Sequence, residues 1–262
     1  MPCSDLTAII LAGVVVFTTF TIESISGFGS TVLALPFIAM LIGIDKAVPF
    51  LSALSLLLTT FIIIRSWRHI NLREYRFIVL HVILTVPLGM FLMDCLPKGI
   101  LLAILTLFML YVGISGLRQT LKSNAATAPG CQNCKTFVMR LILLAGGIIQ
   151  GAFSSGGPLI IIYSSKALPH KSLFRVTMSM VWFTTNITMQ LKWLLSGKVW
   201  NSMLAAQVVC ALPFIGAGML LGDFLHNRVN EKNFRIIVYV ILLTSAVILG
   251  TNTLLNHLKG SI

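Results

Sequence analysis

The sequence predicts an all-α, polytopic membrane protein made of two repeats of about five hydrophobic segments each. Its 262 residues are 57% hydrophobic and only 10% charged, with a mean hydropathy of +0.96. Soluble domains usually carry about 25% charged residues. A core of this size could not hide so much apolar surface from water, so the solvent is a lipid bilayer. Ten apolar runs and an internal match between the two halves of the chain complete the prediction.

The ten apolar runs lie five on each side of a polar linker, 119–136, which separates a first repeat, 1–118, from a second repeat, 137–262. The runs cover 6–22, 28–44, 47–64, 77–93 and 100–117 in the first repeat, and 137–149, 159–168, 173–195, 203–221 and 234–255 in the second. Crossing a bilayer takes about 20 helical residues, so the second run of each half is short. Since 159–168 would extend only about 15 Å, we expect short or broken helices at these points.

Two matched stretches indicate that the halves are repeats. A shift of 127 positions lays the stretch that begins at Glu23 on the one that begins at Gln150. A shift of 129 positions lays 86–94 on 215–223, which share the pattern Gly-Met-x-Leu-x-Asp. Either match alone would be weak, because glycine and leucine are common in membrane helices. Two matches in the same order and at nearly the same shift indicate a duplication.

The basic residues orient the chain in the membrane. The net charge is +12, from 19 Lys and Arg against 7 Asp and Glu. With ten crossings and the amino end outside, most of these basic residues lie on the inner side, as the positive-inside rule requires. An odd number of crossings per half then inverts the second repeat, which is the arrangement that gives alternating access. If the short runs are re-entrant, the number of crossings falls toward eight and the charge argument for this orientation becomes weaker. Anionic headgroups account for the positive charge, so no nucleic acid partner is expected.

Two polar, glycine-rich breaks, 23–30 and 150–158, interrupt the apolar sequence at matching points of the halves. Paired breaks of this kind are typical of a substrate site built from unwound helices. Helices that restart at 28–31 and at Pro158 would direct their positive dipole ends at the breaks, which favours an anion. The alternative is that small residues here allow close helix packing, or that polar side chains bond a neighbouring helix. The candidate substrate-binding residues are Ser24, Ser26, Gly27, Gly29, Ser30, Ser154, Ser155, Gly156, Gly157, Asn186 and Gln190.

Glu23 stands at the end of the first apolar run, beside the first break. A carboxylate at membrane depth is costly and normally faces a cavity or a partner. We expect Glu23 to be a proton-coupling residue, protonated while buried and ionised when one side of the membrane reaches it. The alternative is an interfacial carboxylate in water at a helix end. Because the matching Gln150 is neutral, an acid function would belong to the first break alone.

The repeated motifs point to a known family. They are Ser-Gly-Phe-Gly at 26–29 and Gly-Ala-Phe-Ser-Ser-Gly-Gly-Pro at 151–158. With them, the chain resembles the TauE/SafE sulfite-exporter family of membrane permeases over most of its length. The resemblance implies export or permeation of a small anion such as sulfite, an organosulfonate or an organic acid. Family members often carry other small or apolar residues at Ser154 and Ser155, so the substrate of this chain could differ from sulfite.

Five further residues have two interpretations each. Arg65 and Lys192 end long runs, where they could snorkel to the interface or attract anions to a vestibule. His81, one turn into the fourth run, could be structural or relay protons. Cys131 and Cys134 form a lone C-x-x-C in the linker, and because a structural zinc site takes four ligands, we expect reduced thiols there. No metal and no cofactor are therefore expected.

The expected function is secondary transport of a small anion by alternating access, with proton coupling as an option. The protein would be a multi-pass protein of the cell membrane, or of the inner membrane if the cell has two. It is not expected to be an enzyme, and the chain holds no P-loop motif for ATP. The alternatives are a serine hydrolase that uses Ser26 or Ser155 with His81, although no Gly-x-Ser-x-Gly elbow is present, and a non-transporting assembly subunit. A homodimer could form through small-residue helix faces.

Overall fold

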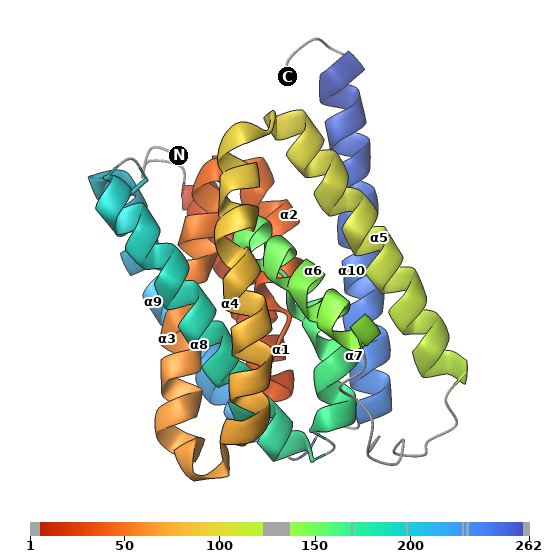
Figure 1. Cartoon of the computed structure of the whole chain (residues 1–262). Coiled ribbons are helices and arrows are strands. Elements are labelled where there is room, and N and C mark those ends of the chain that lie inside the picture. Colours follow the sequence, from red (N-terminus) through yellow and green to blue (C-terminus); the bar gives the residue numbers. More distant parts are fainter. Residues whose placement is uncertain are drawn as a thin grey trace.

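The computed structural model describes residues 6–122, 137–168, 170–197, 199–226, 228 and 231–258, and within them it holds ten α-helices and no strand (Figure 1). The first half forms α1 (Leu6–Ser26), α2 (Ser30–Ile42), α3 (Ile44–Ser66), α4 (Leu72–Cys95) and α5 (Lys98–Lys122), with a short 3-10 helix, η1 (Trp67–His69), after α3. The second half forms α6 (Phe137–Phe153), α7 (Gly157–Ala167), α8 (Lys171–Ser196), α9 (Ser202–Leu225) and α10 (Glu231–Leu258). Each predicted apolar run is a helix, so the all-α prediction is confirmed.

Two short non-helical breaks separate α1 from α2 and α6 from α7, where the sequence predicted them. α1 continues past residue 22 to Ser26 and therefore includes Glu23. α2 begins at Ser30, after Gly29 in a left-handed conformation. α7 begins at Gly157 with Pro158 in its first turn, where the missing N–H of proline has no cost.

The helices after the breaks are too short to cross a membrane by themselves. α2 has 13 residues and α7 has 11, which correspond to about 20 Å and about 16 Å of helix against a hydrocarbon core of about 30 Å. Within the described residues, four helices are long and apolar enough to cross by length and composition, namely α3 with η1, α4, α5 and α9. α8 is as long, with 26 residues, but more polar. It packs against α1, α3, α4 and α7, so its polar groups face other helices.

The helices of the two halves interlock. Counting from the start of each half makes α1 and α6 counterparts, and likewise α4 and α9. α1 packs against α9, and its counterpart α6 packs against α4. α3 packs against its own counterpart α8, and α5 against α10, which lie side by side at one edge of the molecule (Figure 1). Each of these contacts joins the first half of the chain to the second, so the halves do not form separate bundles.

Glycines allow the interlocking helices to approach closely. A Cβ at Gly89 of α4 would collide with the carbonyl oxygen of Ile148 in α6. At the counterpart contact, a Cβ at Gly218 of α9 would lie 2.8 Å from the carbonyl oxygen of Phe17 in α1. At Gly216, two residues earlier, no atom of the described residues lies within 4 Å of such a Cβ. Only some of the glycines of α9 are therefore required by packing.

The outer surface is apolar and the interior carries polar groups. Large apolar side chains are exposed around the bundle, among them Ile64, Leu84, Leu107, Leu195 and Leu254. The buried polar side chains include Glu23, Ser30, Gln150, Ser154 and Asn186. A water-soluble domain has the reverse distribution. The arrangement suits a protein whose surface faces lipid and whose interior holds a polar site, and the polytopic membrane prediction is confirmed.

Candidate functional site

The first glycine-rich break places the Glu23 carboxyl group over the start of α2. Glu23 Oε2 accepts a hydrogen bond from the backbone N–H of Ser30 at 3.2 Å and a second one from the Ser30 hydroxyl. Both residues are buried. The first N–H groups of a helix have no partner within the helix, and the positive end of the helix dipole lies there. The Glu23 side chain therefore caps α2.

The second break repeats this arrangement with an amide. Gln150 Oε1 accepts a hydrogen bond from the Gly156 N–H at 2.9 Å. The amide nitrogen of Gln150 donates to Asn186 Oδ1 at 3.2 Å, and the hydroxyl of Ser154 donates to the same oxygen at 2.9 Å. These buried groups fix the second break to α8.

The two breaks also share a backbone conformation. Gly27 and Ser154, which match at the shift of 127, have positive φ angles of 84° and 51°. Their N–H groups donate to the carbonyl oxygens of Glu23 and Gln150, both at 2.7 Å. A left-handed conformation is unfavourable for a residue with a side chain. At Gly27 a Cβ would also lie 2.7 Å from the Cα of Arg175, so only glycine fits there.

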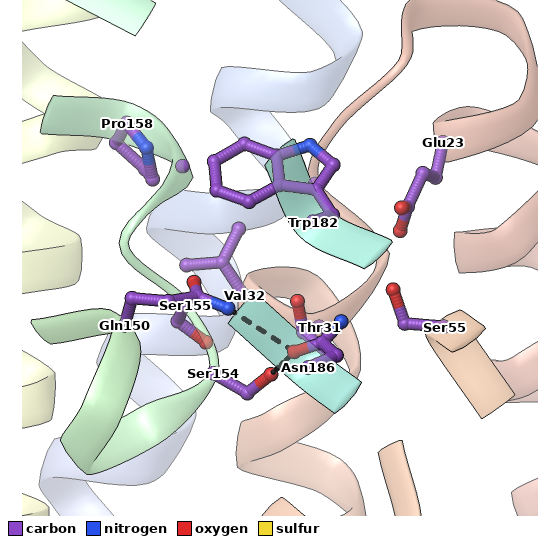
Figure 2. A pocket seen from close by; sticks show the side chains of 12 residues that line it. Glu23, Thr31, Val32, Ser55, Gln150, Ser154, Ser155, Pro158, Trp182 and Asn186 are labelled. Carbon is purple, nitrogen blue, oxygen red and sulfur yellow. Dashed lines mark hydrogen bonds between the residues drawn. The ribbon is translucent and has the colours of Figure 1, made fainter. Parts of the chain in front are cut away.

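A pocket lies between the two breaks (Figure 2). Its cavity volume is about 20 Å³, enough for about one water molecule. Figure 2 shows the Glu23 carboxyl group and the Ser55 hydroxyl directed toward each other. A ligand larger than a few atoms would require the walls to move. The residues that line the pocket are Glu23, Gly29, Thr31, Val32, Ser55, Gln150, Ser154, Ser155, Gly157, Pro158, Trp182 and Asn186.

The pocket offers hydrogen-bond donors from a helix start and from hydroxyl groups. Thr31 and Val32 line it and belong to the first turn of α2, where N–H groups have no partner within the helix. Gly157 lines it at the start of α7, followed by Pro158, which has no N–H. Glu23 is the one ionisable side chain among the twelve lining residues. An anion bound at the start of α2 would therefore lie beside the Glu23 carboxyl group.

One face of α8 holds both breaks. Trp182 Nε1 donates a hydrogen bond to the carbonyl oxygen of Gly27 at 2.9 Å, which fixes the first break. Asn186 accepts the hydrogen bonds of the second break. Residues four apart are neighbours on a helix surface, so a single helix face positions both breaks.

Comparison with known families gives the architecture a name. Residues 10–249, which run from α1 into α10, match the family described as sulfite exporter TauE/SafE. The chain belongs to the TauE/SafE sulfite exporter family. The resemblance predicted from the sequence motifs is thereby confirmed, and the TauE/SafE proteins are membrane permeases for sulfite and other anions. Comparison with curated proteins and with solved structures gave no match.

The residues predicted for the TauE/SafE site divide into two groups. The first group is at the pocket or holds its walls: Glu23, Gly29, Ser154, Ser155, Gly157 and Asn186 line it, Ser30 and Gly156 donate to the capping side chains, and Gly27 accepts from Trp182. The second group bonds backbone elsewhere. Ser24 donates to Met219 of α9 at 3.0 Å, and Gln190 donates to Pro49 of α3 at 2.8 Å. The Ser26 hydroxyl lies 2.8 Å from the carbonyl oxygen of Ile22 and 2.7 Å from that of Phe28, and its one proton is donated to either. Gln190 thus follows its alternative, a bond to a neighbouring helix.

Some pocket residues of this TauE/SafE protein were not among the predicted site residues. Thr31 and Val32 could have been found, because the first N–H groups after a predicted helix start are free. Trp182 also had a signal, since it precedes Asn186 by four residues on the same helix. Ser55 had a weak one, as one of the hydroxyl residues of the third apolar run that could line a path or pack against a helix. Its approach to Glu23 depends on how α3 packs.

The hydrolase alternative is not supported. His81 Nδ1 bonds the carbonyl oxygen of Phe77 at 2.8 Å, and the Ser155 hydroxyl donates to that of Phe153 at 2.9 Å. In the described part of the chain no hydrogen bond joins His81 to Ser155 or Ser26. The family is one of transporters rather than enzymes.

Other predicted features have the following outcomes. Arg65 and Lys192 each form an ion pair, with Asp223 at 2.9 Å and with Asp94 at 2.8 Å. Over the described ranges, no three His, Cys, Asp or Glu side chains gather where they could hold a metal ion. The linker cysteines 131 and 134 lie outside the described residues.

Proposed function

We propose that this protein is a secondary transporter that exports a small anion, such as sulfite, an organosulfonate or an organic acid, across the cell membrane. The pocket between the two glycine-rich breaks, in the interior of the bundle, supports this proposal most directly. In membrane proteins, backbone that leaves helical geometry occurs where it lines a cavity or a substrate site. The helix start at α2 favours a negatively charged ligand.

The donors around the pocket suit the oxygen atoms of a sulfite, sulfonate or carboxylate group. The hydroxyls of Thr31 and Ser55 come from two different helices, α2 and α3, so a bound oxyanion could accept hydrogen bonds from more than one direction. None of the described residues that line the pocket has a basic side chain. An anion held by dipoles and hydroxyls is bound more weakly than one paired with arginine, which a transporter needs in order to release it.

Glu23 couples the anion to a proton. An anion at Thr31 and Val32 lies beside the Glu23 carboxyl group, and two negative charges at that separation repel each other. The anion therefore binds when Glu23 carries a proton, and both leave the site together. Protonation keeps an oxygen available to accept from Ser30, so the cap of α2 survives.

The transport cycle is alternating access by two inverted halves. Each half has three helices of 23 or more residues, α3 to α5 and α8 to α10. If the short α2 and α7 return their hairpins within the membrane, an odd number of crossings per half remains and the halves have opposite orientations. The interlocked packing of counterpart helices supports the same arrangement.

Flux into and out of liposomes tests the proposal. The purified protein is reconstituted, and the movement of labelled sulfite, sulfoacetate and small carboxylates is measured with and without a pH gradient. At least one anion is expected to move faster than in protein-free liposomes, and faster still when the side that holds it is acidic. If none of these anions moves, the protein is not a transporter of this class.

The predicted homodimer stays a prediction. Light scattering of the purified protein in detergent would give its mass, and a mass of one chain would contradict it.

A further inference from the structure

Two ion pairs occupy repeat-related positions at the predicted opposite faces of the membrane. Arg65 and Lys192 are separated by the shift of 127 that relates the two breaks, and Asp94 and Asp223 by the shift of 129. The structure pairs them crosswise, Arg65 Nε with Asp223 Oδ2 at 2.9 Å and Lys192 Nζ with Asp94 Oδ2 at 2.8 Å. Each pair joins the first half to the second, α3 to α9 and α8 to α4.

All four residues stand near the carboxyl ends of their helices. An aspartate is unfavourable there, because the negative end of the helix dipole repels it. A basic partner from the other half removes that conflict. Both halves therefore have an aspartate at an unfavourable helix end and a basic partner that stabilises it. The two pairs nevertheless lie at opposite faces of the predicted topology.

α8 shows how the pairs lie relative to the pocket. Arg175, near its start, donates from both terminal nitrogens to Asp223 Oδ1, at 3.1 Å and 3.0 Å. Trp182 and Asn186 follow in the pocket wall, and Lys192 comes last. At 1.5 Å per residue, Arg175 and Lys192 are about 26 Å apart along the helix, with the pocket residues midway between them.

The two pairs differ in burial. Arg175 is buried and adds a second partner to Asp223, and the corresponding position in the first half is Val48. The side chains of Lys192 and Asp94 are 41% and 60% exposed. The Arg65 side chain is also exposed, at 64%, but Asp223 is only 19% exposed and is held by Arg175 as well. Exposed ion pairs are weak, so the pair of the predicted outer face separates more easily than the contacts of Asp223 at the inner face.

We propose that these pairs are the two gates of the transport cycle, an inference that rests on the proposed function. Opening toward the outer face separates Lys192 from Asp94 while Arg65 and Arg175 keep Asp223. Opening toward the inner face does the reverse. The structure has both pairs formed around a cavity of about 20 Å³, which corresponds to the closed state between the two openings.

Thiol labelling in the pocket tests the gates without any substrate. The five native cysteines are replaced by serine, and Thr31→Cys places one thiol in the pocket wall. The rate of its reaction with a membrane-impermeant thiol reagent is measured in vesicles of either orientation. We expect Asp94→Asn to raise the rate from the outer face by about two- to fivefold, the factor that an exposed ion pair provides. Arg65→Gln should raise the rate from the inner face by about twofold, because Arg175 still holds Asp223.

The control uses an ion pair within one half. Lys98 Nζ lies 2.5 Å from Asp45 Oδ2, and both residues belong to the first half. Asp45→Asn should leave both rates unchanged, and exchanging the charges at 94 and 192 should return the outer rate to its original value. Because Arg65 and Asp94 are exposed, their variants should fold, which the unfolding temperature checks. The gates would be overturned if the Asp94 and Arg65 variants react no faster than the Asp45 control. They would also be overturned if both variants speed labelling from the same face of the membrane. Absence of anion flux in liposomes would instead overturn the proposed function.

Discussion

Glu23 and Gln150 each accept a backbone hydrogen bond at the start of the helix that follows, one with a carboxyl group from the first residue of α2 and the other with an amide from the residue before α7. The distances from their side-chain oxygens to the backbone nitrogens are 3.2 Å to Ser30 and 2.9 Å to Gly156. The shift that relates the two halves aligns these two residues in sequence. The second break therefore shows how the first break could be held by a neutral side chain.

Glu23→Gln should remove the pH dependence of anion binding and keep the binding itself. Under the proposed coupling, one proton binds with each anion in the wild type, so the affinity should fall by up to about tenfold per pH unit once Glu23 ionises. The amide still accepts from Ser30, as Gln150 does from Gly156, and it carries no charge at any pH. Its affinity should therefore stay near the low-pH value of the wild type. Isothermal titration at several pH values measures this.

A variant that keeps the pH slope of the wild type would contradict the role of Glu23. Thr188→Ala is a suitable control for effects of a substitution that does not touch the pocket. Thr188 lies on α8 outside the pocket lining, and its hydroxyl donates to the backbone of its own helix at Thr184.

Asn186→Ala should destabilise the protein and loosen the second break. Asn186 Oδ1 accepts from both Gln150 and Ser154. Its removal takes the acceptor from the buried Ser154 hydroxyl, whereas Gln150 Nε2 keeps its longer hydrogen bond to Thr185 at 3.4 Å. A buried polar group without a partner costs about 1–3 kcal/mol. Thermal unfolding in detergent should show a clear decrease in midpoint, and anion affinity should fall as well. Thr188→Ala on the same helix should change neither, and an Asn186 variant as stable as that control would refute the network.

The sequence predicted much of the fold because the membrane imposes simple rules. Long apolar runs between polar segments become helices in lipid, and all ten did. Glycine and serine next to Glu23 and Gln150 also marked both breaks, since these residues interrupt a pattern that has few other interruptions. The helix boundaries were less accurate, because residues such as Ser24 satisfy their hydroxyl groups against a neighbouring helix and so remain helical.

The contacts between helices could not be predicted in the same way. Asn186 and Gln190 are equivalent by spacing, yet one faces the pocket and the other donates to Pro49 of α3. The choice depends on how α8 is rotated and tilted against its neighbours. The pairing of Arg65 with Asp223 likewise joins residues far apart in sequence, so no local pattern contained it.

Ser154→Gly and Ser154→Ala should separate the backbone role of this residue from the role of its hydroxyl. Both variants lose the hydrogen bond to Asn186, but only glycine accepts a φ of 51° without strain. The glycine variant should be more stable than the alanine variant by about 1 kcal/mol. Chemical unfolding of the two proteins under the same conditions measures the difference. Equal stabilities would mean that the positive φ is not strained.

Gly89→Ala should be strongly destabilising, and Gly216→Ala should not. A Cβ at Gly89 would collide with the backbone of α6 at Ile148, which has no flexible atom that could yield, so α4 and α6 would have to separate. Overpacking of this kind costs about 1–3 kcal/mol. At Gly216 the Cβ meets no atom of the described part of the chain within 4 Å, and alanine favours the helix by up to about 1 kcal/mol. Unfolding midpoints of the two variants should therefore move in opposite directions from the wild type. A Gly89 variant with an unchanged midpoint would contradict the close contact between α4 and α6 that joins the two halves.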